Sequence, residues 1–92
     1  KFTISDVVFR QILEYIAVQT PAIHKITRTR VDNYGEGAKI YIEVTVVYGI
    51  NVIEGISDFK IKAKKEIEKL TAMNVVELDV VAKNIYVPEK EN

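Results

Sequence analysis

The segment 39–48 constrains the fold of this chain more than any other part of its sequence. Apolar residues fall there at every second position, with Ile40, Ile42, Val44 and Val46 on one side of the pattern. A period of two is typical of a strand with one buried face, because successive side chains of a strand point to opposite sides of the sheet. The even-numbered side chains are therefore predicted to face a core.

A junction between this strand and a helix follows at once, in the segment 48–52, which reads YGINV. Asn51 followed by Glu54 resembles a capping box, in which the Asn side chain accepts a hydrogen bond from the first helical turn and the acid reaches back. Gly49 is expected to adopt positive φ or to lie under close packing. We interpret Tyr48, Gly49, Asn51 and Glu54 as a structural junction without catalytic chemistry.

A helix is predicted over residues 52–70, because apolar residues recur there at spacings of three and four. Such a stripe must pack on another element, and each large apolar side chain that it buries contributes roughly 1.5–3 kcal/mol before entropy is subtracted. Gly55 interrupts the pattern, and either close helix packing or fraying of the first turn accounts for it. The predicted stripe consists of Val52, Ile56, Phe59, Ala63, Ile67 and Leu70.

A shorter helix is predicted near the N-terminus, after Ser5 and before Pro21. Ser5 is a good N-cap, and Ile4 is placed to pack against Phe9. Pro21 ends the helix, because proline disfavours helical geometry in the residue before it. The apolar face of this helix is expected to comprise Val8, Ile12, Leu13, Ile16 and Ala17.

Two further strands complete the predicted order. A β-branched run at 26–31 leads through the turn-rich segment 32–37 into the strand 39–48, and a last strand covers 75–86. We place 39–48 at the centre with 26–31 at an edge. This placement makes the last strand a parallel neighbour of the central one, joined to it by a right-handed crossover through the helix. Its core-facing residues are expected to be Val76, Leu78, Val80 and Ala82.

These elements predict an α+β fold of order α-β-β-α-β. It is a two-layer sandwich in which two helices pack on one face of a three-stranded sheet. Phe2-Thr3 is a candidate for a short extra N-terminal strand. The chain of 92 residues suits one domain, which we assign to 1–88, and 89–92 are taken as a polar tail.

The composition narrows the partners and the location of the protein. Thirteen basic and thirteen acidic side chains cancel, so no overall charge draws the chain to nucleic acid or acidic lipid. The chain has no cysteine, which excludes disulfides and is compatible with a reducing compartment. No apolar run approaches the roughly 20 residues of a membrane span, and the N-terminal residues do not resemble a signal peptide. We expect a cytoplasmic protein that does not insert directly into a membrane.

Candidate catalytic residues are few and isolated. His24 is the only histidine, and no cysteine or carboxylate pair in the sequence accompanies it as a metal site. Ser5 is explained as a cap, and Ser57 stands beside Asp58 in a helix without a nucleophile elbow. The glycines of 35–37 match neither a phosphate-binding loop nor a dinucleotide fingerprint. We therefore expect no enzyme, no cofactor and no metal.

The face of the sheet opposite the helices has no predicted third layer to cover it. It is interpreted either as an ordinary solvated sheet or as a protein-contact surface, and the long edges of the sheet invite strand addition between copies. The candidate interaction surface consists of Arg28, Arg30, Tyr41, Glu43, Thr45, Glu77, Asp79 and Lys83.

A row of lysines on the second helix offers an alternative function. A small KH-like nucleic-acid-binding module would use the face from Lys60 to Lys69 to contact phosphates. Against this reading, the sequence has no Gly-x-x-Gly clamp and no paired strand aromatics, and Glu66 and Glu68 dilute the charge. A solvated helix face is the better interpretation, and nucleic acid is not the expected partner.

Several segments together resemble one known family. They are ISDVV at 4–8 with Ile12 and Ala17, IYIEVTVVYGINV at 40–52, IEKLT at 67–71, and 75–80. This pattern resembles the alkaline shock protein family of envelope stress-response proteins, found chiefly in Gram-positive bacteria. The resemblance implies an abundant, cytoplasmic, non-enzymatic protein that self-associates and is sometimes recruited by a membrane-anchored partner. It supplies no catalytic residues.

Two turns depart from that family's pattern. Ala22-Ile23 stands where the family usually has Gly-Val, and 71–73 reads Thr-Ala-Met where it has Thr-Gly-Leu. Asn74 tolerates left-handed geometry and is a candidate replacement for the second glycine. The leading hypothesis is thus a non-enzymatic interaction or scaffold protein of the envelope stress response. Its expected partners are itself, as a homo-oligomer, and a membrane-anchored protein through which it would associate with the membrane.

Overall fold

The structure is a computed structural model that describes residues 4–34 and 37–89. Its elements follow the predicted order: α1 spans Asp6–Val18, β1 Ile23–Tyr34, β2 Gly37–Val47, α2 Val52–Thr71 and β3 Val75–Tyr86. The candidate strand at Phe2-Thr3 and most of the proposed tail, residues 90–92, lie outside the described residues.

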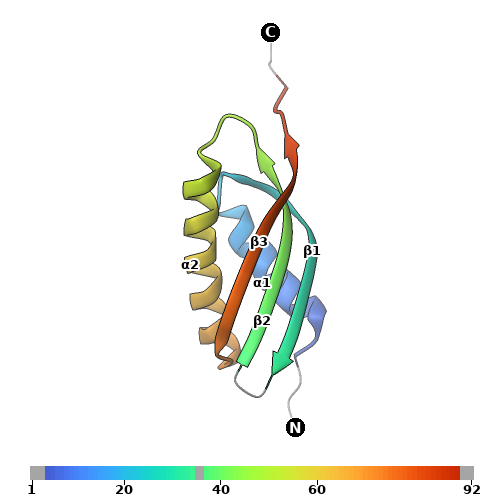
Figure 1. The fold of residues 1–92 in the computed structure, drawn as a ribbon, viewed down its shortest axis with the longest axis vertical. Coiled ribbons are helices and arrows are strands. Elements are labelled where there is room, and N and C mark those ends of the chain that lie inside the picture. Colours follow the sequence, from blue (N-terminus) through green and yellow to red (C-terminus); the bar gives the residue numbers. More distant parts are fainter. Residues whose placement is uncertain (1–3, 35–36, 90–92) are drawn as a thin grey trace.

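The sheet has the predicted arrangement, with β2 at its centre. β1 pairs with β2 in antiparallel orientation and β3 pairs with β2 in parallel. Figure 1 shows α1 crossing behind the strands and α2 standing next to β3, so one face of the sheet carries the helices. Neither described helix combines the length and the apolar character that a membrane crossing needs.

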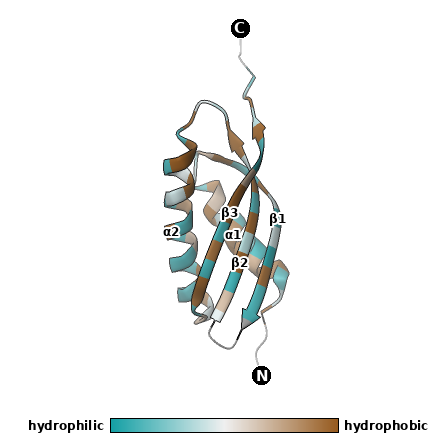
Figure 2. Cartoon of the chain, in the orientation of Figure 1, coloured by the Kyte–Doolittle hydropathy of each residue, from teal (hydrophilic) through white to brown (hydrophobic). Residues whose placement is uncertain are grey.

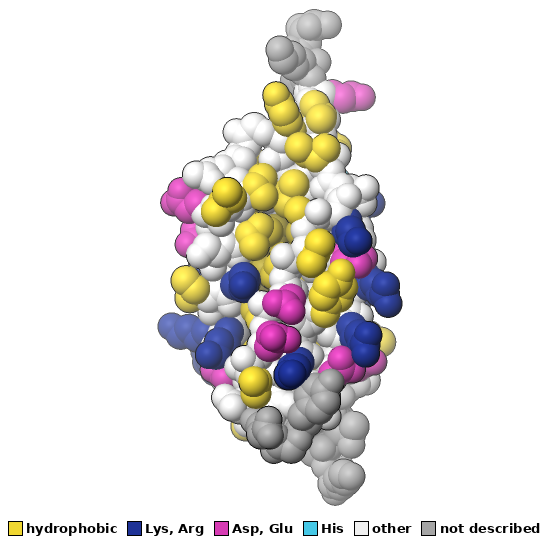
Figure 3. Space-filling model, viewed as in Figure 1, with side chains coloured by type: hydrophobic (Ala, Val, Ile, Leu, Met, Phe, Trp, Pro, Cys, Tyr) yellow, Lys and Arg dark blue, Asp and Glu magenta, His cyan; other side chains and the backbone are white. Residues whose placement is uncertain are grey.

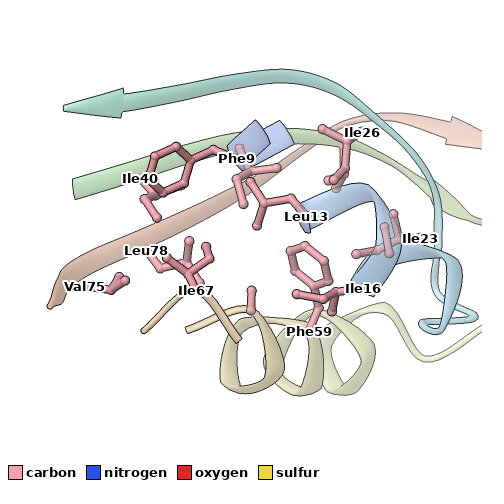
Figure 4. Close-up of a cluster of buried hydrophobic side chains, with 14 of the residues drawn as sticks. Phe9, Leu13, Ile16, Ile23, Ile26, Ile40, Phe59, Ile67, Val75 and Leu78 are labelled. Atoms are coloured by element: carbon pink, nitrogen blue, oxygen red, sulfur yellow. The ribbon is translucent and has the colours of Figure 1, made fainter. Parts of the chain in front are cut away.

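The core lies between the helices and the face of β2 that the alternation predicts. Ile40, Ile42, Val44 and Val46 are all buried. The hydropathy colouring in Figure 2 shows the same alternation along the strands. Figure 4 shows that side chains from both helices and all three strands meet there. The helices contribute Phe9, Leu13, Ile16, Ala17, Phe59, Ala63 and Ile67 to this core.

The apolar stripes of the two helices differ from the predicted ones at their margins. In α1 Phe9 is buried and Val8 is exposed, because Phe9 and not Val8 lies in line with Leu13 and Ile16 on the sheet side. In α2 Leu70 is 59% exposed, although the preceding positions of the stripe are covered. Val8 and Leu70 instead line a groove between the two helices.

A β-bulge near the start of β3 changes which of its residues face the core. Val75 pairs with Ala38 and Glu77 pairs with Lys39, so Val76 is an extra residue between them. As a result Val75 is buried and Val76 is exposed. Leu78 is buried as predicted and Val80 packs partly against the core, whereas Ala82 is exposed.

The junction between β2 and α2 has the expected cap. Asn51 Oδ1 accepts a hydrogen bond from the Glu54 backbone N–H at 3.1 Å. The Glu54 carboxylate reaches back to the Asn51 side-chain amide, with the two atoms 3.4 Å apart. Gly49 has φ +92, and a Cβ added to it would meet nothing within 4 Å, so its conformation and not its packing favours glycine.

Two small residues, Gly55 within α2 and Ala72 just after it, have backbone or packing requirements of their own. A Cβ added to Gly55 would overlap that of the buried Ala22, so close packing explains this helical glycine. Ala72 adopts the left-handed conformation, with φ 58 and ψ 16, and its N–H donates to the Glu68 carbonyl. The expectation that Asn74 would take the place of a turn glycine was therefore wrong: Ala72 itself has that backbone geometry.

Candidate interaction surface

The open face of the sheet is assembled by the strand register. Arg28 pairs with Glu43 and Arg30 with Tyr41 across β1 and β2. Tyr41 in turn pairs with Asp79 of β3. Because paired residues of neighbouring strands share a face, these side chains form rows across the sheet.

Charged side chains concentrate over the lower half of this face, as Figure 3 shows. A hollow of about 460 Å³ lies among them. Arg30 Nε lies 3.1 Å from Asp32 Oδ2, and the two side chains are 64% and 39% exposed. A solvent-exposed pair of this kind contributes little to stability, so the charges are available for contacts outside the chain. The hollow is lined by Arg28, Arg30, Asp32, Lys39, Ile40, Tyr41, Glu77 and Asp79.

Tyr41 and Glu43 form the best-defined polar contact on this face. The Tyr41 hydroxyl donates a hydrogen bond of 2.7 Å to Glu43 Oε2. This bond, more than desolvation or the Glu43 charge, raises the pKa of the Tyr41 phenol above its ordinary value. The nearby Arg28 acts in the opposite direction, and Asp79 adds to the increase. Tyr41 therefore presents a protonated, oriented ring beside a carboxylate.

The upper half of the same face is apolar. Figure 3 shows hydrophobic side chains gathered there, over the C-terminal ends of β2 and β3. The His24 and Tyr86 rings stack with centroids 3.8 Å apart and planes 4° apart, which ties β1 to β3, and no histidine is visible on the face in Figure 3. Ile85 and Val87 beside Tyr86 are more than half exposed. His24 is thus a strand residue in an aromatic contact.

The predicted surface residues divide into four groups, one of which is Glu43, the hydrogen-bond partner of Tyr41. Arg28, Arg30, Tyr41, Glu77 and Asp79 come together around the hollow. Thr45 is only 6% exposed and offers little surface for contact. Lys83 falls at a second register shift of β3, between the partners of Val44 and Thr45.

Two charged residues that line the hollow were not among the predicted surface residues, although the same alternation points to them. Asp32 continues the row of Arg28 and Arg30, and Lys39 precedes Tyr41 by two positions. The sequence assigned Asp32 to a turn, because the segment after it is rich in turn residues. In the structure β1 continues to Tyr34, so Asp32 pairs with Lys39 inside the sheet.

The lysines of α2 do not form one row. Lys60 and Lys64 line a groove with β3, next to Glu77 and Asp79. Lys62, Lys65 and Lys69 line a different groove, between α2 and α1. The KH-like alternative relied on a single basic face from Lys60 to Lys69, and this arrangement gives it no support. Within residues 4–34 and 37–89 no group of three His, Cys, Asp or Glu side chains is placed to hold a metal ion.

The architecture defines a class of fold: two helices on one face of a three-stranded mixed sheet whose other face is open. Solved structures with this fold include the C-terminal domain of MamM. A variant of it in a copper form has a TM-score of 0.68 and 14% sequence identity, covering 92% of this chain and 100% of that one. A manganese form has a TM-score of 0.68 and 13% identity, with 87% and 99% covered. A zinc form gives 0.67 and 13%, with 94% and 89% covered.

The alkaline shock resemblance is corrected by these comparisons. No family model matches the chain, and no curated protein matches it. The structural neighbours are MamM domains, so the assignment to Gram-positive envelope stress proteins was wrong. The segments that suggested it encode an alternating strand, a helix cap and apolar stripes, which are features of many small α+β domains.

Proposed function

We propose that this chain is a non-enzymatic protein-interaction domain and that the open face of its sheet is the contact surface. The observation that carries the proposal is the composition of that face. It combines an oriented polar cluster around Tyr41 with an apolar area over the C-terminal ends of β2 and β3. Interfaces typically combine aromatic and arginine side chains with an apolar centre.

A second copy of the chain is the partner that we propose first. The face carries cations from β1, such as Arg28, and carboxylates from β3, such as Asp79, so it offers both signs of charge to a copy of itself. The same fold in the MamM domains is compatible with such a role. A membrane-anchored protein remains the second proposed partner, and recruitment by it would bring the domain to a membrane. We propose a cytoplasmic location for the domain.

Sedimentation at several protein concentrations tests this proposal. We expect concentration-dependent association that Arg28→Glu and Tyr41→Ala weaken. Lys62→Glu is the matched control, because it makes the same change of charge on the helix side of the molecule, and it should associate like the wild type. The proposal would be overturned if the protein were a strict monomer at all concentrations and if Arg28→Glu and Tyr41→Ala left partner pull-down unchanged.

A further inference from the structure

The helix layer is wider than the sheet that it covers. Two packed helices span about 20 Å, since each is about 10 Å across. Three strands spaced about 4.8 Å apart span only about 14 Å. The difference of about one strand spacing falls at β3, and Figure 1 shows α2 lying beyond that edge of the sheet.

The overhang leaves a groove of about 380 Å³ between α2 and β3. Its helix side is formed by Lys60, Ile61 and Lys64. Ile61 is 67% exposed, although it lies on the helix next to the sheet. The other side of the groove is β3 itself, which contributes Glu77, Leu78 and Asp79. An apolar floor therefore lies between two basic side chains and two acidic ones.

The edge of β3 along this groove can accept another strand. No strand of the described part of the chain pairs with β3 on the side away from β2. At the start of β3 the Val75 N–H donates to the Glu68 carboxylate at 2.9 Å, which caps that end. Beyond Val75 the strand runs on to Tyr86. An added strand would also lie on the overhanging part of α2 and cover Ile61.

We propose that this groove binds an extended segment of a partner polypeptide as a fourth strand. Such β-augmentation takes its affinity from backbone hydrogen bonds and its specificity from alternate side chains. Side chains on the open face would lie beside Glu77 and Asp79, which favours Lys or Arg. Side chains on the other face would meet Ile61 and Leu78, which favours apolar residues. The partner segment therefore alternates basic and apolar residues.

A second copy of the whole domain does not fit this edge. A two-fold axis joining two β3 strands makes them antiparallel and puts both helix layers on the same face of a six-stranded sheet. Four helices would then need about 40 Å above strands that span about 29 Å. A strand that brings no helix of its own avoids this crowding. The site is thus separate from the self-association proposed for the open face.

The test uses a capped peptide that alternates valine and lysine. Its length of about nine residues is within the usual range for strands. NMR shifts and amide hydrogen exchange are measured on the full chain, together with peptide titrations. We expect slower exchange along β3 and shifts at Lys60, Ile61 and Lys64. Ile61→Asp should weaken binding at least about tenfold, equivalent to about 1.4 kcal/mol. Ile53→Asp is the matched control, because Ile53 is 85% exposed on α2 outside this groove, and it should bind like the wild type.

Charge and backbone variants complete the test. The double variant Glu77→Lys, Asp79→Lys should bind the valine-lysine peptide at least about tenfold more weakly and prefer a valine-glutamate peptide, because the sign of its neighbours is reversed. A peptide methylated on its backbone amides should not bind. Any of three results would overturn the proposal. They are absence of binding, equal binding of the methylated peptide, and NMR shifts confined to the open face or to the groove between α1 and α2. Arg28→Glu leaves β3 unchanged, so its effect on self-association is separable from these outcomes.

Discussion

The two faces of β2 have different roles, and alternate residues of this one strand belong to each. Ile42 is fully buried under the helices, whereas Tyr41 beside it lies at the polar hollow of the open face. Side chains one position apart therefore differ in what they do, since one contributes to the core and the other is available to a partner. Substitutions at Ile42 and at Tyr41 can therefore change stability and recognition independently on the same strand.

The largest expected effect is on the covered face. Ile42→Ala should lower the free energy of unfolding by about 2–5 kcal/mol, because it removes buried methyl groups and leaves a cavity. Denaturant unfolding followed by circular dichroism measures this. Arg28→Ala on the open face is the control and should change the free energy by no more than about 0.5 kcal/mol. Equal losses in the two variants would show that the faces are not energetically distinct.

Gly55→Ala tests how tightly the helix layer is packed. The added methyl group would overlap Ala22, and overpacking typically costs about 1–3 kcal/mol. The gain in helix propensity offsets up to about 1 kcal/mol of this. We expect a net loss of about 1 kcal/mol in the free energy of unfolding. Ser57→Ala, an exposed position of the same helix, should gain slightly, and a gain at Gly55 would show that α2 can move away from Ala22.

Gly49→Val tests the junction that leads from β2 into the helix layer. Because Gly49 has φ +92, a branched side chain is strained there, and the free energy of unfolding should fall by more than about 1 kcal/mol. Gly49→Asn should lose less, since asparagine tolerates left-handed geometry better. An unchanged denaturation midpoint in the valine variant would mean that the junction adapts to a side chain.

Ala72→Gly should stabilise the domain, in contrast to the losses above. Ala72 holds the left-handed conformation at the end of α2, which costs an alanine roughly 1–2 kcal/mol. Glycine removes that cost but has greater freedom in the unfolded chain, so the net gain should be about 0.5 kcal/mol. Thermal unfolding measures it. Lys65→Gly, inside the same helix, should instead lose about 1 kcal/mol.

The sequence predicted the covered face better than the open one. The period of two in β2 and the spacing in α2 report burial directly, so the element order, the central strand and most of the core followed from them. The bulge at Val76 could not be read, because one extra residue in a strand leaves no mark on a short apolar run. The sequence identified most of the open-face residues around the hollow, but turn residues obscured the extension of β1 through Asp32 to Tyr34. The groove at β3 depends on the relative widths of two layers, which no local pattern encodes.

The smallest expected effect concerns the open face alone. Glu43→Gln should lower the pKa of Tyr41, because the hydrogen bond to the carboxylate is the main cause of its increase. An NMR titration of ring-labelled tyrosine measures this, with Glu14→Gln as a remote control that should leave Tyr41 unchanged.

The sign of the linkage is also defined. Because the pKa of Tyr41 is raised in the folded state, the protonated phenol stabilises the fold at every pH below its pKa in the unfolded chain. This contribution is lost as the pH rises through the pKa of the folded state. Tyr41 is only partly buried, so the contribution that Glu43→Gln removes at neutral pH should be small. Association through the open face would desolvate the phenol and raise its pKa further as the protein concentration increases. A Tyr41 pKa that does not depend on concentration in an associating sample would place the contact elsewhere on the molecule.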